Sequence, residues 1–174
     1  MVKVDKVMLG EQVTGPLGLV VTTAPTAGVR KLIPCPDPLP SAGKAVAGKF
    51  AEWKAEKDGR VTTVAQYTAL YQGVAGRDVV KESRAVASCH TPTPDDVGLQ
   101  PYVQVGLAST KRFVDDRFGF CEYPVGGDDC TCTAVLAKGE VVTVVAVHGP
   151  RGSDPSVDPD LKDFVPALTD LLFA

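Results

Sequence analysis

The clearest pattern of apolar and polar positions runs from Arg112 to Val147 and predicts a three-stranded antiparallel meander. In order, the expected strands and turns are 112–123, 125–128, 130–137, 138–140 and 141–147. Both turns contain glycine, which reaches the backbone angles of tight turns at little cost. The last strand is almost continuously apolar and β-branched, which is typical of a strand covered on both faces.

Helical spacing predicts three helices. The first is expected from Ser41 to Lys57, because Ser41 can cap a helix and the apolar residues Val46, Phe50 and Trp53 follow a helical stripe. The second is expected over 76–88. The third follows Asp158-Pro159 and carries a strong apolar face, with a bend expected at Pro166.

Further strands are expected at 17–23, 61–67 and 102–108, while the proline-rich stretch 24–40 is expected to be irregular. The order of elements predicts an α+β fold. We expect a mostly antiparallel sheet with helices packed on one face, stabilised by disulfides. The length of 174 residues predicts a single domain over 1–174.

Charge and hydropathy exclude some classes of partner. The net charge is −3 and no dense run of Lys and Arg occurs, so we expect no nucleic-acid partner. The longest apolar run is too short for a membrane span. The first six residues are too polar for a signal peptide, so the protein is either cytosolic or begins after a removed signal or anchor.

The cysteines favour an extracytoplasmic location. Five cysteines in 174 residues, three of them in the meander, are typical of a disulfide framework in an oxidising compartment. If Gly126-Gly127 forms a two-residue turn, Cys121 lies opposite Cys132 at a separation that a disulfide can bridge. A shift of two residues in the register would put Cys130 there instead. We favour Cys132, and Cys130 stays as the alternative.

The placement of the cysteines and helices resembles a known family. Cys35 precedes the first expected helix, and the second ends as Ser83-Arg84-Ala85-Val86-Ala87-Ser88-Cys89. A meander with further cysteines and a closing helix follow. This order resembles the extracellular sensor domain of the PknH-type receptor kinases of actinobacteria and the related secreted or lipid-anchored proteins, over residues 7–172.

The resemblance implies an α+β domain with two intramolecular disulfides that binds an extracellular ligand. By position, Cys35 would pair with Cys89, and Cys121 with Cys130 or Cys132. The fifth cysteine departs from the family pattern. A bridge from Cys35 to Cys89 would close a loop of about 55 residues, worth about 3–4 kcal/mol in the chain-entropy model.

No motif in the sequence identifies a catalytic or metal centre. Cys130-Thr131-Cys132 lacks the usual zinc spacing, and neither His90 nor His148 belongs to a nucleophile motif. Asp115-Asp116 are adjacent on a strand, so their side chains point to opposite faces. Gly126-Gly127 lacks a nucleotide-binding pattern. We therefore predict no catalytic residue, no metal and no cofactor.

Charge on one strand gives the candidate ligand-binding residues. They are Arg112, Asp115, Asp116 and Arg117, which would line a polar groove if the open face of the sheet forms one. Trp53, Tyr67 and Tyr71 are expected to be packing residues.

Three functional hypotheses follow. The favoured one is a non-catalytic extracytoplasmic sensor-like domain that binds a small molecule or a protein. The second is a small cytosolic enzyme or binding protein of specialised metabolism with reduced cysteines, which predicts a deep, mainly apolar pocket. The third is a protein–protein interaction module that uses an exposed sheet edge.

Overall fold

The computed structural model describes residues 4–33, 35–57, 59–89, 99–124, 129–150 and 161–174. Its centre is a seven-stranded antiparallel sheet in the order β1-β2-β3-β7-β6-β5-β4. The strands are β1 (Val20–Ala27), β2 (Ala45–Lys57), β3 (Arg60–Tyr71), β4 (Leu99–Val105), β5 (Asp116–Pro124), β6 (Asp129–Lys138) and β7 (Val141–Pro150). The helices are η1 (Val4–Val7), α1 (Glu11–Thr14), η2 (Ala42–Lys44), α2 (Gly76–Val86) and α3 (Leu161–Leu172). The predicted α+β class with a mostly antiparallel sheet is confirmed.

The predicted meander is present as β5, β6 and β7. Phe118 lies opposite Val135, and Cys121 lies opposite Cys132, as a two-residue turn at Gly126-Gly127 requires. The turn itself lies outside the described residues. Gly139 sits in the second turn with φ +60°, a conformation that glycine adopts readily. The first strand begins at Asp116, four residues later than expected.

The helix predicted over Ser41–Lys57 is wrong. Apart from the short η2, this segment is the strand β2, which pairs with β3 along its whole length, from Ala45–Tyr71 to Lys57–Arg60. Alanine, lysine and glutamate are good helix formers, but intrinsic helix propensity is a small free energy per residue. The pairing of β2 with β3 along the long hairpin outweighs it. Phe50 and Trp53, predicted on one helical stripe, belong to the separate cores on the two faces of the sheet.

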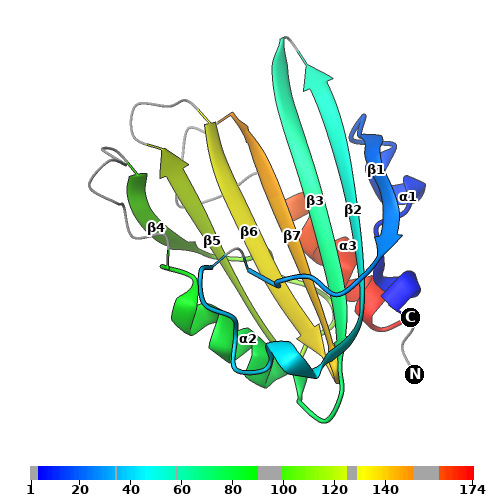
Figure 1. The fold of residues 1–174 in the computed structure, drawn as a ribbon. Coiled ribbons are helices and arrows are strands. Elements are labelled where there is room, and N and C mark those ends of the chain that lie inside the picture. Colours follow the sequence, from blue (N-terminus) through cyan, green and yellow to red (C-terminus); the bar gives the residue numbers. More distant parts are fainter. Residues whose placement is uncertain (1–3, 34, 58, 90–98, 125–128, 151–160) are drawn as a thin grey trace.

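Helices cover both faces of the sheet, which corrects the prediction that they pack on one (Figure 1). On the face that we call the α2 face, Val79 and Val80 of α2 pack with Val135. On the opposite α3 face, Phe164 and Val165 of α3 pack with Leu136. Since β6 and β7 lie inside the sheet and are apolar on both sides, each of their faces needs cover.

Other expected boundaries change as well. The strand expected at 61–67 is the longer β3, and the strand expected at 102–108 is β4, which begins at Leu99 and ends at Val105. The strand at 17–23 is β1, which continues to Ala27 and so takes in the first four residues of the stretch expected to be irregular. The chain then crosses the α2 face without regular structure as far as Ser41. The helix α3 runs through Pro166, and a bend there stays a prediction. The cap expected at Asp158-Pro159 lies outside the described residues.

Candidate functional site

A cavity of about 390 Å³ lies on the α2 face, over the middle of the sheet. Its floor contains Ala65, Ala146 and Thr133, which are neighbours on β3, β7 and β6. Larger side chains stand around these small ones, among them Phe120 and Val144. Small residues at the centre of a sheet face and large ones around them leave a concave, mainly apolar space of the size that small-molecule sites have.

The irregular segment from Gly28 to Ser41 forms one wall of this cavity. Leu32 and Ile33 line the cavity and are buried, so this part of the segment is packed on the sheet rather than extended into solvent. They join the α2-face core together with Cys35. An irregular segment of this length within a compact domain needs anchors, and the structure provides several.

Two hydrogen bonds attach the start of the wall to the sheet. The N–H of Gly28 donates to the carbonyl of Gly48 on β2 (2.9 Å), and the N–H of Arg30 donates to the hydroxyl of Tyr67 on β3 (2.8 Å). Gly48 allows this approach because a Cβ there would lie 2.5 Å from the oxygen atoms of both Gly28 and Tyr67. The close contact of wall and sheet therefore requires glycine at this position.

A disulfide and an acidic side chain attach the rest of the wall to α2. Cys35 is bonded to Cys89, three residues beyond the end of α2, with 5.8 Å between their Cα atoms. At the far end of the segment, the N–H of Ser41 donates to the Glu82 carboxylate (3.0 Å). The disulfide thus joins two cavity walls, because Ala87 beside α2 also lines the cavity. This is the pairing that the family resemblance implied.

The second disulfide joins Cys121 and Cys132 across β5 and β6, with 4.1 Å between their Cα atoms. Both residues are buried in the α3-face core. Cys130, the alternative partner for Cys121, is outside both disulfides and is half-buried.

Charged groups lie at two ends of the cavity. Arg30 and Lys31 come from the wall, and the Arg30 guanidinium carbon lies 4.0 Å from the centroid of the Phe50 ring on β2. Lys31 Nζ donates to the carbonyls of Cys35 and Pro36 (3.0 and 2.9 Å). Glu122 lines the cavity from β5.

The tyrosines beneath the wall stay protonated at neutral pH. Burial raises the pKa of Tyr67, and the hydrogen bond from Arg30 offsets only part of that effect. Burial, followed by the neighbouring Tyr67 and the Glu82 carboxylate, raises the pKa of Tyr71 still further. Tyr67 is expected from the sequence as a packing residue, yet it both packs in the core and holds the cavity wall.

A second, wider hollow of about 590 Å³ lies where β3 and the β6–β7 turn end. Its lining includes Val46, Gln72, Gly139 and Glu140, all of them exposed. A molecule in this hollow would keep much of its surface in water. The cavity over Ala65 and Ala146, with its buried wall, is therefore the better candidate site.

The four residues predicted to bind a ligand lie outside this cavity and take part in contacts within the protein. The Asp115 carboxylate accepts hydrogen bonds from Lys138 Nζ and from the N–H of Gly139, both at 2.7 Å. The contact with Lys138 is the main reason why the pKa of Asp115 is lowered, and the N–H of Gly139 acts in the same direction. Asp115 thus ties the start of β5 to the β6–β7 turn.

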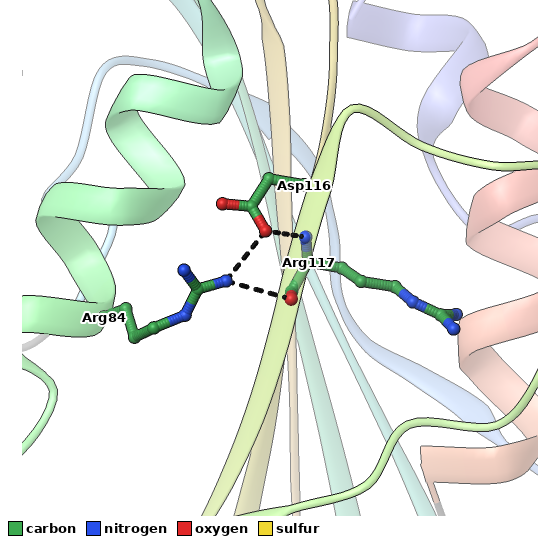
Figure 2. Close-up of polar contacts among 3 residues, drawn as sticks. All are labelled: Arg84, Asp116 and Arg117. Atoms are coloured by element: carbon green, nitrogen blue, oxygen red, sulfur yellow. Dashed lines mark hydrogen bonds and ion pairs between the residues drawn. The ribbon is translucent and has the colours of Figure 1, made fainter.

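Asp116 and Arg117 extend from opposite sides of β5, as the alternation along a strand predicts (Figure 2). Arg84 of α2 donates to the Asp116 carboxylate (2.7 Å) and to the carbonyl of Arg117 (3.1 Å). The Arg117 guanidinium donates to the carbonyl of Ala108 (2.9 Å). Arg112 lies over the Phe173 ring. No common groove brings the four together, and ligand binding by them stays a prediction.

The residues weighed for metal or nucleophile chemistry are dispersed. His148 Nδ1 lies 3.0 Å from the hydroxyl of Thr131, on the neighbouring strand. His90 lies outside the described residues. Within the part of the chain that the structure describes, no group of three or more His, Cys, Asp or Glu side chains could hold a metal ion.

The candidate cavity has little signature in the sequence. Its lining comes from β2, β3, β5, β6, β7, the wall and the end of α2. The floor residues Ala65 and Ala146 are ordinary strand residues when taken singly. One signal was available, because Asp58-Gly59 between two alternating segments indicates a β-hairpin and would have placed Phe50 beside Tyr67.

Comparison with known proteins supports the fold alone. The chain matches the crystal structure of an uncharacterised protein from Mycobacterium smegmatis, an ortholog of Rv0999, with a TM-score of 0.52 and 13% sequence identity. The match covers 99% of this chain and 98% of the other. No protein-family model matches the sequence. No curated protein matches it either.

Among the described residues, no helix has both the length and the apolar character needed to cross a membrane.

Proposed function

We propose that this chain is a non-catalytic, extracytoplasmic binding domain that takes a small, mainly apolar molecule into the cavity over Ala65 and Ala146. The observation that carries the proposal is the combination of a mainly apolar cavity of about 390 Å³ and a wall that is covalently fixed by the Cys35–Cys89 disulfide. A fixed wall lowers the ordering cost of binding, because the site is formed before the ligand arrives.

The two disulfides support the extracytoplasmic part of the proposal. Disulfides form and persist in oxidising compartments, whereas thiols in the cytosol are kept reduced. The resemblance to extracellular sensor domains agrees with this location. However, one of the two helices on which the resemblance rests is the strand β2, so the cysteine pairing carries more weight than the order of elements.

The cavity combines features of two hypotheses drawn from the sequence. A mainly apolar pocket was expected for a cytosolic enzyme or binding protein, and two disulfides were expected for a sensor-like domain. We favour binding over catalysis because the lining includes no nucleophile with a base that a third described group orients. Thr131 and Thr133 come from one strand, and His148, which contacts Thr131, is exposed.

The third hypothesis, a protein–protein interaction module that uses an exposed sheet edge, receives less support. The edge strand β1 is exposed, but it contains Pro25, which lacks a backbone donor, and its pairing with β2 has two register shifts. Proline and irregular register are devices that prevent a further strand from joining a sheet edge.

Filling the cavity tests the proposal. Ala146→Leu places a larger apolar side chain on the floor, and Ala85→Leu makes the same change at an exposed position of α2 outside the lining. The neutral apolar dye Nile red should gain fluorescence with the wild type and with Ala85→Leu. It should bind Ala146→Leu at least about tenfold more weakly, because the leucine occupies its space. Equal binding by all three proteins would reject the cavity as the site.

A further inference from the structure

Two consecutive residues of the cavity wall carry cationic side chains. Arg30 and Lys31 both line the cavity and are exposed, so they are in contact with solvent and with its interior. The backbone of Arg30 is fixed by its hydrogen bond to Tyr67, and the stacking of its guanidinium on Phe50 limits where the charge can go. The charge therefore has a defined place at the β2 end of the cavity.

Neither cation has an acidic partner in the described part of the chain. The ammonium group of Lys31 donates to two backbone carbonyls, which are neutral. The Arg30 guanidinium has its contact with the Phe50 ring and makes no hydrogen bond to another described residue. Contact with an aromatic ring leaves the N–H groups of a guanidinium available as donors. Five N–H donors in a planar fork suit a carboxylate or a phosphate.

Arg30 and Lys31 are the cationic residues of the lining, and Glu122 is its acidic residue. Glu122 belongs to β5, which is four strands away from the β2 strand that carries Phe50, or about 19 Å at the usual strand spacing. Ala87 directly follows α2, whose carboxyl end carries the negative end of the helix dipole. An anion is therefore favoured at the Arg30 end of the cavity and less favoured beside the carboxyl end of α2. Between the two ends lies the apolar floor of Ala65, Ala146 and Val144.

We infer that the ligand is an amphipathic oxyanion, with its carboxylate or phosphate group on Arg30 and its apolar body over Ala65 and Ala146. This inference rests on the proposed function and adds the chemical class and the orientation of the ligand. A carboxylate and a phosphate ester share the chemistry that Arg30 recognises, and the experiment below distinguishes them.

The test compares three probes with the same ten-carbon chain, namely decanoate, decyl phosphate and decanol. The affinity of each probe is measured by its displacement of Nile red from the wild type, from Arg30→Gln and from Arg60→Gln. Arg30→Gln removes the charge but keeps the backbone N–H that Tyr67 accepts. Arg60→Gln makes the same change at an exposed position outside the lining. Arg30→Lys keeps the charge without the planar fork.

The wild type should bind at least one oxyanion about tenfold more tightly than decanol, because a hydrogen bond between charged groups adds to the apolar contact. Arg30→Gln should remove the oxyanion's advantage and leave the affinity for decanol within about twofold of the wild-type value. Arg30→Lys should keep part of the oxyanion's advantage. Raising the salt concentration should weaken the oxyanion more than decanol. The headgroup that loses more affinity in Arg30→Gln identifies the class of natural ligand.

Two results would overturn the inference and leave the proposed function intact. One is that Nile red binds but decanol competes as well as both oxyanions. The other is that Arg30→Gln weakens decanol and the oxyanions equally. If Nile red does not bind the wild type at all, the proposed function itself fails.

Discussion

Gln66 and Leu9 lie 57 residues apart and are joined by a hydrogen bond of 2.8 Å from the Leu9 N–H to the Gln66 side-chain oxygen. The Gln66 amide nitrogen donates back to the carbonyl of Val7, also at 2.8 Å. Gln66 is 1% exposed, and its amide also reaches the Thr143 hydroxyl at 3.1 Å. This one side chain substitutes for a strand partner and holds the N-terminal segment on the α3 face.

Gln66→Leu should therefore destabilise the protein by about 3 kcal/mol, because it leaves the Leu9 N–H and the Val7 carbonyl buried without partners. Gln72→Leu is the control, since Gln72 is exposed, and it should change the free energy of unfolding by less than about 0.5 kcal/mol. Chemical denaturation measures both. Hydrogen exchange should show the Leu9 amide losing protection in Gln66→Leu, and unchanged protection would mean that another group holds this segment.

The two disulfides should differ in what they contribute to stability. The Cys35–Cys89 bond spans 54 residues in sequence, and the Cys121–Cys132 bond spans 11. In the chain-entropy model the first contributes about 4 kcal/mol and the second about 3 kcal/mol, because a longer loop restricts the unfolded chain more. Chemical denaturation of the double variants Cys35→Ala/Cys89→Ala and Cys121→Ala/Cys132→Ala measures the free energy of unfolding that each disulfide contributes. The first variant should lose more.

The first disulfide should also affect the cavity. Loss of the Cys35–Cys89 bond frees the wall from the end of α2, so Nile red affinity should fall in that variant under conditions where it is still folded. Loss of Cys121–Cys132, whose residues lie in the α3-face core, should leave the affinity nearly unchanged. The opposite pattern would contradict the assignment of the wall.

The carboxylate of Asp115 should make stability depend on acid pH. Its pKa is lowered in the folded protein, chiefly by the hydrogen bond from Lys138, so folding favours the ionised form. This stabilisation is complete above the unfolded-state pKa of about 3.9 and disappears as the pH falls through the lower folded-state value. Asp115→Asn should cost less than about 1 kcal/mol at pH 7, because the group is exposed to solvent. Its difference from the wild type should vanish below the folded-state pKa, as acid-dependent denaturation would show.

Arg84 and Asp116 attach α2 to β5, and they should be energetically coupled. A double-mutant cycle of Arg84→Gln and Asp116→Asn isolates their interaction. The pair is partly exposed, so we expect a coupling of about 0.5–1 kcal/mol that decreases at high salt. Glu56 and Lys57, adjacent exposed residues on β2 that point to opposite faces, provide a control pair with no coupling. Coupling of zero for Arg84 and Asp116 would mean that solvent screens the contact completely.

How far the sequence predicts the fold depends on how local the signal is. Strands β5 to β7 were found because their apolar alternation and glycine turns lie within one short stretch. Helix α2 was found because Val79, Val80 and Ser83 follow a helical period that matches their burial. Strand β2 was missed because its composition favours a helix, and only its pairing with β3 decides otherwise.

The site was less predictable than the fold. The sequence shows the predicted binding residues only as a concentration of charge on one strand, whereas in the fold Asp115 and Asp116 bond to groups of the protein itself. The cavity depends on small residues of different strands meeting in the sheet, and on Arg30 reaching Phe50. These contacts depend on the register of the strands and on the path of the wall across the sheet. Neither can be read from the linear sequence.

A methyl nuclear magnetic resonance titration of the wild type with Nile red would locate the binding site residue by residue. We expect saturable shifts of the methyl signals of Ala65, Ala146 and Val144, which line the cavity, and little change at Val46 and Leu70, which line the wider hollow. Shifts at Val46 and Leu70 without any at Ala65 and Ala146 would place the binding site in the wider hollow and contradict its location in the cavity beneath the Cys35–Cys89 wall.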